Sequence, residues 1–456
     1  MKQLYLKYQP YYKDNFHLAY PVVISQLGHT LVALSDSIII GHTGKVPLAA
    51  VSLGNSLFNI FMVTGIGMSY GLTPLIAQEN GRGNKKAIGH LLSHSLIINM
   101  VVGFLLSAVI YFGSSHLELL KQEADVAEQA RPFLRYLGFS FIPLMLFLSF
   151  KQFAEGLGFT RQAMNISIIG NVINIIIGIT LVYGLFGMPR LGVIGVGIAT
   201  FTDRLIMGIT MAFYVLKSPR FKPYLQSFGF RHLEWASVKK ILGIGTPVAL
   251  QYIFEISAFS GAAVIVGWMG AAELAAHQIA LSLAAMTYMM ASGISAAAGI
   301  KSGNNFGKKD YQSLRHSAIA SYHMVLVLMG TTALIFMLLK NLLPAMYIND
   351  PQVIPIAAGL LVIAAFFQLF DGTQVVGLGI LRGLGDVRMP TLITLLAYWG
   401  IGIPLGYVLG IQLGYGVEGV WWALLLGLLT ASVLLFFRFH IKSRKLANAG
   451  NDKIIQ

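Results

Sequence analysis

The amino-acid sequence predicts an all-α polytopic membrane protein with about twelve transmembrane helices, and three observations lead to this fold class. Hydrophobic residues make up 56% of the 456 residues and charged residues 11%, whereas soluble domains have about 45–50% apolar and about 25% charged residues. The mean hydropathy is +0.70. Apolar segments of about 20 residues recur along the whole chain, and each can cross the roughly 30 Å hydrocarbon core of a bilayer.

The predicted transmembrane segments follow one another in the order given by their apolar runs. They are expected at residues 16–40, 50–75, 92–113, 130–153, 164–185, 191–216, 242–267, 274–299, 316–339, 354–381, 388–411 and 417–437. The residues before the first segment include Lys2, Lys7 and Lys13 but lack the short apolar region and cleavage site of a signal peptide. The first segment is therefore expected to be a retained helix.

The distribution of positive charge predicts the orientation of these segments. The net charge is +14, and Lys and Arg residues are concentrated in every second connection and near both termini. The remaining connections carry only Lys45, Lys121, Arg131, Arg190 and Lys340. Because cytoplasmic loops are enriched in Lys and Arg, both termini are expected in the cytoplasm. The basic surplus is thus assigned to topology and to contact with anionic membrane lipid, and no nucleic-acid partner is expected.

An internal repeat divides the chain into two halves. An offset of 226 residues pairs Pro21 with Pro247 and Gly67 with Gly293, and an offset of 227 pairs EGLG with RGLG. Each half holds six segments, an even number, so the two halves enter the membrane from the same side and the repeat is parallel. The expected domains are a six-helix lobe at 1–216, a basic cytoplasmic linker at 217–240, a six-helix lobe at 241–437 and a basic cytoplasmic tail at 438–456.

Three carboxylates, Asp36, Glu255 and Asp371, lie in the middle of apolar runs. Such placement costs roughly 2.5 kcal/mol or more for each acid, and none of the three has a Lys or Arg within one helical turn. One interpretation is a buried carboxyl group that stays protonated and is satisfied by a neighbouring hydroxyl or amide. Since three acids occur on three helices, we favour a shared cavity that carries ions, protons or a charged substrate.

Other side chains share helical faces with these acids and are expected to line the same cavity. These candidate lining residues are Gln251, Tyr252, Phe259, Phe367, Gln368, Gln374 and His29. Asn174, Gln278 and Tyr288 are further candidates, with interhelical hydrogen bonding or core packing as the alternative. The neighbouring Asp203 and Arg204 are interpreted as a structural pair of opposite charges.

Several function classes are excluded or disfavoured. The chain has no cysteine, which excludes disulfides and thiol catalysis. Gly-rich stretches such as GHTGK lack the spacing and strand context of phosphate-binding loops, and the 49 glycines fit close helix packing. We find no nucleophile, metal-cluster or cofactor motif, so neither an enzyme nor a cofactor is expected. Paired lobes suit alternating access around a site near the midplane of the membrane.

Three motifs together with the doubled layout resemble the multidrug and toxic compound extrusion (MATE) family, in its NorM-like branch. The motifs are EGLGFTRQAM at 155–164, LAAHQIAL at 274–281 and LRGLGD at 381–386, and the similarity extends from Pro21 to the last predicted helix. The resemblance implies a secondary antiporter that exports cationic amphipathic drugs in exchange for Na⁺ or H⁺. It also implies a multi-pass protein of the bacterial cytoplasmic membrane, and we expect a monomer.

The resemblance also implies roles for individual residues. Glu255 and Asp371 match the second-lobe acids used for cation coupling and are the candidate Na⁺ ligands, while Asp36 matches a first-lobe acid associated with proton coupling, near Asn174. Two positions depart from the family pattern. Phe367 stands where relatives often have a tyrosine, and Gly178 stands where they commonly keep a second polar residue. Both departures shift the expected coupling toward the second lobe.

Two alternatives to a cation-coupled antiporter stay open. A flippase of the same superfamily would carry an anionic lipid-linked substrate and would need Arg or Lys in its cavity, where this sequence has acids. An ion channel or ion-translocating subunit would not require a duplicated pair of lobes.

Overall fold

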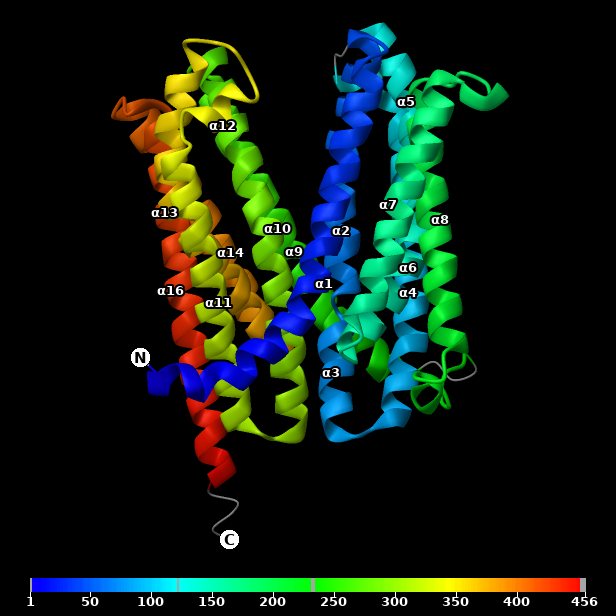
Figure 1. Ribbon diagram of the computed structural model, residues 1–456, viewed down its shortest axis with the longest axis vertical. Coiled ribbons are helices and arrows are strands. Elements are labelled where there is room, and N and C mark those ends of the chain that lie inside the picture. Colours follow the sequence, from blue (N-terminus) through cyan, green and yellow to red (C-terminus); the bar gives the residue numbers. More distant parts are fainter. Residues whose placement is uncertain (1, 121–122, 231–233, 452–456) are drawn as a thin grey trace. The chain divides into compact units, whose positions relative to one another are not determined.

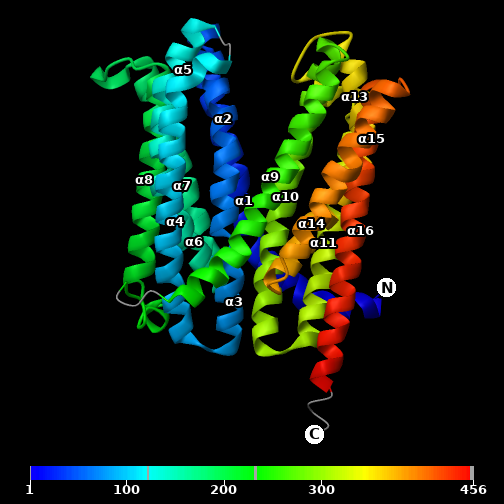
Figure 2. The same cartoon turned by 180° about the vertical axis from the view of Figure 1, so that it is seen from behind.

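A computed structural model of the protein describes residues 2–120, 123–230 and 234–451, and the regular structure of these residues is entirely helical. Among them are 12 helical segments that are long and apolar enough to cross a membrane, which confirms the predicted fold class. The long helices run side by side within each half of the molecule (Figure 1) and are seen from behind in Figure 2.

The helices of the N-terminal half are α1 (Lys2–Gly41), α2 (Lys45–Ser69), α3 (Leu72–Arg82), α4 (Lys85–Gly113), η1 (Ser114–Leu120), α5 (Ala124–Phe139), α6 (Phe141–Gly156), α7 (Thr160–Tyr183), η2 (Leu185–Gly187), α8 (Val193–Lys217) and η3 (Lys222–Tyr224). Those of the C-terminal half are α9 (Trp235–Gly267), α10 (Ala271–Lys308), α11 (Tyr311–Leu338), α12 (Leu342–Ala345), α13 (Val353–Gly383), α14 (Arg388–Leu395), η4 (Leu396–Gly402), α15 (Ile403–Tyr407), η5 (Val408–Gln412) and α16 (Gly416–Asn451).

The chain forms two compact units whose limits differ from the expected lobe limits. The N-unit comprises Ile24–Ala249, and the C-unit comprises the chain up to Val23 together with Leu250 onward. The expected lobes instead began at residue 1 and at residue 241. The helices α1 and α9 therefore each contribute to both units, because the first part of each packs on the unit formed mainly by the other half of the sequence.

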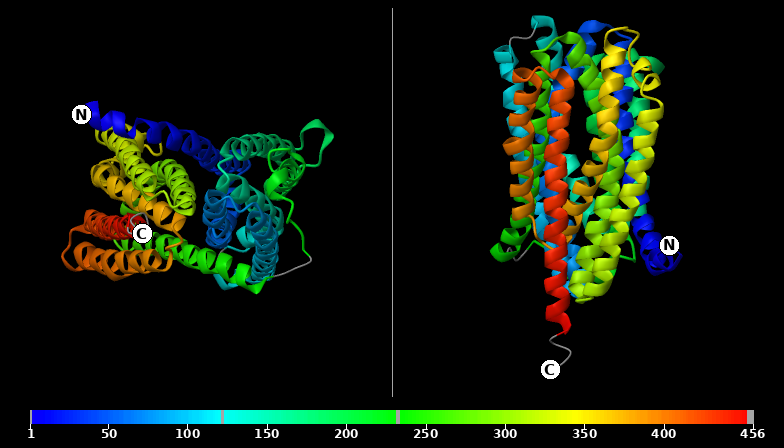
Figure 3. Two further views of the ribbon diagram at one scale, coloured as in Figure 1. Left: turned by 90° about the horizontal axis from the view of Figure 1, so that it is seen from below. Right: turned by 90° about the vertical axis from the view of Figure 1, so that its left-hand side faces the viewer.

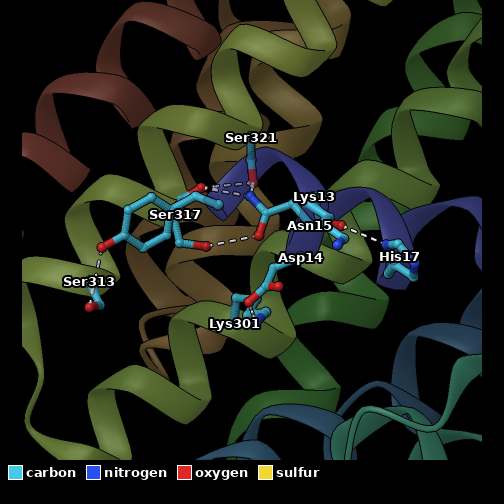
Figure 4. Close-up of polar contacts among 9 residues, drawn as sticks. Lys13, Asp14, Asn15, His17, Lys301, Ser313, Ser317 and Ser321 are labelled. Atoms are coloured by element: carbon cyan, nitrogen blue, oxygen red, sulfur yellow. Dashed lines mark hydrogen bonds and ion pairs between the residues drawn. The ribbon is translucent and has the colours of Figure 1, made fainter. Parts of the chain in front are cut away.

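The first part of α1 is held on the C-unit by polar contacts with α10 and α11 (Figure 4). Asn15 is buried and donates from Nδ2 to the Ser317 carbonyl oxygen and to Ser321 Oγ, both at 2.9 Å, while Ser317 Oγ donates to Asn15 Oδ1. Asp14 forms an ion pair with Lys301 at 2.7 Å. These contacts tie the beginning of the sequence to residues about 300 positions later.

Described residues of the expected linker at 217–240 pack against the N-unit. Phe221 is fully buried, and its ring contacts those of Phe153, Phe159 and Tyr214. The Glu234 backbone N–H donates to His94 Nε2 at 2.8 Å. Apolar anchoring by Phe221 explains why a basic and polar segment follows the surface of this unit; residues 231–233 of the linker lie outside the described residues.

The C-unit is built around the close pairing of α10 and α13, with α11 and α16 packed beside them. A Cβ atom added at Gly299 would lie 2.8 Å from the Gly379 carbonyl oxygen, so the two backbones approach as closely as glycine permits. The helix α16 continues to Asn451, past the expected start of a cytoplasmic tail at residue 438. Its last turns protrude at the end of the C-unit where α1 begins (Figure 3).

Candidate functional site

The two C-unit acids are buried on neighbouring helices. Glu255 on α9 is 5% exposed and Asp371 on α13 is 3% exposed, and the charge of each acts on the other. Glu255 Oε2 has no hydrogen-bond partner among the described residues. The apolar sequence around each acid makes a helix whose side chains exclude water. A carboxylate oxygen in this position is available to a proton or a cation.

Tyr398 completes this acidic site from a third helical segment, η4. Gln374 Nε2 lies 3.0 Å from the Tyr398 hydroxyl oxygen, and the hydroxyl oxygen lies 3.1 Å from Gln374 Oε1 and 3.5 Å from Glu255 Oε1. Tyr398 and Gln374 are both fully buried. The Tyr398 phenol, the Gln374 amide and the Glu255 carboxylate therefore form one hydrogen-bonded group.

Aromatic side chains form the adjoining wall of the site. The Phe259 ring centroid lies 6.1 Å from that of Phe367 and 5.8 Å from that of Tyr398, with near edge-to-face geometry. Phe367 in turn contacts Trp421 at 5.5 Å. Aromatic faces of this kind can attract a cation as well as exclude water.

The remaining predicted C-unit residues are placed as follows. Gln368 is fully buried and accepts a hydrogen bond from Thr332 at 2.9 Å. Tyr288 is partly buried and lies within electrostatic reach of both acids, whereas Gln278 is exposed. Gln251 is 4% exposed, and the partly buried Tyr252 lies 6.0 Å from the Arg382 guanidinium group.

The N-unit contains a second buried acidic group. Asn174 Nδ2 donates to Asp203 Oδ2 at 2.9 Å and approaches Thr200 Oγ1 at 3.4 Å. The charges of Asp203 and Arg204 both act on Asp36, which is 7% exposed. Asp36 thus has a second carboxylate near it, although the sequence suggested a single acid in this half.

Arg204 compensates part of this negative charge. Its guanidinium group donates to Ser140 Oγ at 2.6 Å and lies 4.8 Å from the Phe58 ring centroid. One oxygen each of Asp36, Asp203 and Asn174 is buried without a hydrogen-bond partner among the described residues. The two carboxylate oxygens can accept a proton, and the amide oxygen of Asn174 can accept a hydrogen bond. His29 lies on the N-unit part of α1 and is partly buried.

The described residues contain no cluster of three or more His, Asp or Glu side chains able to hold a metal ion. The expected Na⁺ site at Glu255 and Asp371 has two carboxylates and is a different kind of arrangement, supplemented here by the Tyr398 hydroxyl and the Gln374 amide oxygen. Such oxygen donors fit Na⁺, and they fit a proton equally well. The assignment of this site to Na⁺ stays a prediction.

Sequence patterns missed two residues of these groups. Tyr398 lies in LLAYWG, an ordinary aromatic stretch without an acid on its helical face. Asp203 was recognised as an intramembrane charge but was assigned to its sequence neighbour Arg204. The bond that Asp203 accepts from Asn174 also connects it to the predicted site.

The motif LAAHQIAL has a structural role that the geometry explains. The Trp421 Nε1–H donates to His277 Nδ1 at 3.1 Å, and both side chains are fully buried. This bond joins α16 to α10 beside the aromatic wall.

The fold and the buried acids define a polytopic membrane protein with a polar site inside each of two helical units. The family model described as MatE matches the chain twice, at residues 21–180 and 247–408. These two stretches begin 226 residues apart, the offset of the internal repeat. The chain belongs to this family, the multidrug and toxic compound extrusion transporters.

Relatives with known names extend over almost the whole chain. The multidrug resistance protein MdtK of Yersinia enterocolitica is 34% identical over 93% of this chain and 94% of its own length. The probable multidrug resistance protein NorM of Xylella fastidiosa is 32% identical over 94% of this chain and 92% of its own length. The family resemblance inferred from the sequence motifs is therefore confirmed.

Solved structures show the same fold at lower sequence identity. The eukaryotic MATE transporter AtDTX14 aligns with a TM-score of 0.87 at 19% identity, covering 98% of this chain and 100% of its own. A multidrug resistance MATE family transporter in an outward-facing conformation aligns with a TM-score of 0.88 at 18% identity, covering 96% of this chain and 97% of its own.

Proposed function

We propose that the protein is a secondary antiporter that exports cationic amphipathic compounds in exchange for inward Na⁺ or H⁺, by alternating access of two lobes. The observation that carries this proposal is the buried pair Glu255 and Asp371 beside an aromatic wall, with Glu255 Oε2 open to a further partner. The names of the relatives, multidrug resistance proteins, support the substrate class.

Charge balance supplies the mechanism. In an outward-facing state, the ionised carboxylates of Glu255 and Asp371 attract an external cation, which neutralises the site. The neutralised site no longer attracts a positively charged compound, and that compound leaves to the outside. The lobes then return at lower electrostatic cost. In the inward-facing state, a compound from the cytoplasm or the inner leaflet displaces the cation, and aromatic rings such as Phe259 add about 0.5–2 kcal/mol of cation–π attraction each.

The flippase alternative has less support from the buried charges. An anionic substrate requires buried cations that no carboxylate neutralises. Arg204, however, lies beside Asp203 in the sequence, and its positive charge acts on the Asp36 carboxylate. Lys151 is buried 3.8 Å from Glu155. The buried Lys151 and the partly buried Arg204 thus each have a neighbouring carboxylate.

We further propose that both termini are cytoplasmic in a bacterial inner membrane and that the protein acts as a monomer. The concentration of Lys and Arg in alternate connections supports this orientation. The chain has no cysteine, so single cysteines can be introduced in place of Lys85 and Lys45. A membrane-impermeant thiol reagent added to intact cells then labels only the cysteine that faces the outside. The proposal expects labelling from outside at position 45 and protection at position 85, and the reverse pattern contradicts it.

The transport proposal is tested with the purified full-length chain in proteoliposomes. A fluorescent cationic dye is loaded, and a Na⁺ gradient or a proton gradient is imposed separately. Wild type is expected to move dye under at least one gradient. Glu255→Gln and Asp371→Asn should each lower the rate of gradient-driven transport at least about tenfold, which corresponds to a free-energy difference of about 1.4 kcal/mol. Asp36→Asn tests the N-unit acid.

Matched controls and rival substrates complete this experiment. Asp125→Asn and Glu128→Gln change exposed acids of α5 and should transport like wild type. If all three buried-acid variants also transport like wild type, the central claim fails. Movement of a fluorescent lipid phosphate in place of the dye indicates a flippase, and cation flux without a fixed ratio to dye indicates a channel.

A further inference from the structure

The first part of α1 extends beyond the length that a membrane-spanning helix needs. At 1.5 Å per residue, the 40 residues Lys2–Gly41 measure about 60 Å along the helix, roughly twice the hydrocarbon thickness of a bilayer. This first part runs across α11, near the end of the C-unit that carries both termini (Figure 1, Figure 3). A helix in this position can lie in the membrane surface.

One face of the segment is fixed on α11. The Tyr8 ring is buried, and its centroid lies 5.6 and 5.3 Å from the ring centroids of His316 and His323. The Tyr12 hydroxyl lies 2.8 Å from His323 Nδ1. The contacts of Asn15 with α11 continue this face. Because the helical period places these residues on one side, the other side of the segment points away from the C-unit.

The outward side combines exposed apolar and basic side chains. Leu6 and Phe16 are each 57% exposed, and Lys13 and His17 are exposed near them. Lys7 is exposed at the edge of this side. Apolar groups beside Lys residues are typical of an amphipathic helix that lies between the lipid headgroups and the acyl chains.

Basic groups from three helices come together beside Lys7. The charges of Lys7 and Arg315 both act on His316 of α11. The Arg315 guanidinium group donates from Nη2 to His440 Nδ1 on α16 at 3.3 Å. Asp310 also acts on His316, but its side chain caps the beginning of α11. The site therefore carries an excess of positive charge.

The other acids at this end of the C-unit do not neutralise that excess. Asp14 and Asp386 are ion-paired with different Lys and Arg residues. None of the ion pairs formed by the described residues includes Lys7, Lys13 or Arg315. Uncompensated basic groups next to exposed apolar side chains are complementary to an amphiphile with an anionic headgroup.

We propose that the first part of α1, together with Arg315, is a binding surface for an anionic phospholipid in the leaflet on the side of both termini. The lipid phosphate lies against Lys7 and Arg315, and Lys13 adds a further positive charge. Leu6 and Phe16 contact the acyl region. The bound lipid holds the beginning of α1 at the membrane surface. This inference goes beyond the proposed antiport, and its test needs no transport.

Native mass spectrometry of the purified full-length chain in detergent measures the binding. Phosphatidylglycerol, phosphatidylcholine with the same acyl chains, and soluble glycerol phosphate are titrated separately. Wild type should bind phosphatidylglycerol at least about tenfold more tightly than phosphatidylcholine, because several basic groups act on the anionic headgroup together. Lys7→Gln and Lys13→Gln should each weaken binding of phosphatidylglycerol about fivefold, the contribution of one basic residue near an anionic surface, and leave binding of phosphatidylcholine unchanged.

Matched variants separate the effect of charge from a loss of structure. Lys340→Gln removes an exposed lysine from the opposite end of the same unit and should bind phosphatidylglycerol like wild type. Arg315→Gln should weaken binding, whereas Arg315→Lys keeps the positive charge and should retain most of the affinity. Unfolding midpoints of all variants in detergent without added lipid should equal that of wild type for the exposed positions.

The outcomes distinguish this inference from the proposed function. Tighter binding of phosphatidylglycerol that is weakened in Lys7→Gln and Lys13→Gln supports the lipid surface, whether or not a dye is transported. Equal binding of the two lipids, or wild-type affinity in both variants, overturns it. Glycerol phosphate that binds as tightly as the lipid overturns the choice of a lipid. If phosphatidylglycerol binds as expected but no gradient drives efflux, the proposed antiport fails while the lipid surface stands.

Discussion

Asp386 illustrates how single residues fix the end of the C-unit that carries both termini. Its carboxylate accepts from Arg438 Nε and Nη2 at 2.8 and 2.9 Å and lies 3.1 Å from Lys442 Nζ. Burial alone would raise the pKa of Asp386, but the hydrogen bonds and charges of Arg438 and Lys442 outweigh it and lower that pKa below its usual range. These contacts hold the part of α16 that follows its apolar segment against the end of α13.

Replacement of this carboxylate should destabilise the C-unit and remove a pH dependence. We expect Asp386→Asn to lower stability by about 1–3 kcal/mol, since it leaves Arg438 without its bidentate partner. Because the folded-state pKa lies below the unfolded value of about 3.9, the stabilisation is present above that value and is lost as the pH falls through the folded-state pKa. Thermal unfolding in detergent at a fixed scan rate, from neutral pH to below pH 4, measures both effects.

Asp125→Asn provides the comparison for this measurement, because it removes an exposed carboxylate of the same type. It should leave the unfolding midpoint nearly unchanged. Equal midpoints for Asp386→Asn and wild type at neutral pH contradict the assigned role of the ion pair.

Residues were predictable from sequence where their cost in a membrane is visible. Glu255 and Asp371 stood out because a buried acid in an apolar run needs a reason. Tyr398 did not, because an aromatic residue in a membrane segment has many ordinary explanations. The pairing of Asp203 with Arg204 was visible as adjacency in the sequence, but its hydrogen bond from Asn174 was not, since adjacency says little about which side chains meet across helices.

At the level of helices, the close pairing of α10 and α13 depends on glycines that packing distinguishes and sequence does not. A Cβ atom at Gly379 would collide with the Ser295 carbonyl oxygen, whereas one at Gly330 on α11 would meet nothing within 4 Å. Both glycines lie within apolar helices. Hydropathy correctly predicted the number of spans, but the π-helical interruptions η4 and η5 of the segment predicted at 388–411 and these contacts depend on neighbouring helices that one segment cannot reveal.

The two glycines should therefore respond in opposite directions to the same substitution. Gly379→Ala should destabilise the protein by about 1–3 kcal/mol, since the backbones must separate. Gly330→Ala should stabilise it by about 0.5–1 kcal/mol through helix propensity. Unfolding midpoints of the two variants, recorded under identical conditions, give the comparison. If both midpoints shift in the same direction, the space beside α13 does not determine the effect of the substitution on stability.

For the whole molecule, the two positions at which the chain passes between compact units are related by the internal repeat, and this relation predicts where α1 and α9 flex. The chain passes from one unit to the other after Val23 and again after Ala249, and these positions are 226 residues apart, as are the two MatE matches. Pro21 and Pro247 precede the two crossings by two residues each. A proline inside a helix lacks one backbone hydrogen bond and weakens the helix locally.

If the two units rock during transport as proposed, α1 and α9 must flex where they change units. We expect Pro247→Ala and Pro21→Ala each to lower the maximal rate of dye efflux several-fold while the substrate concentration at half-maximal rate changes little, because the restored hydrogen bond stiffens the helix without touching the acidic site. The double variant should be slower than either. Pro10→Ala, in the same helix as Pro21 but well before the crossing after Val23, should transport normally. A normal rate for Pro247→Ala beside a slow Pro21→Ala would mean that only one crossing moves, and the duplicated chain would then use its two halves unequally.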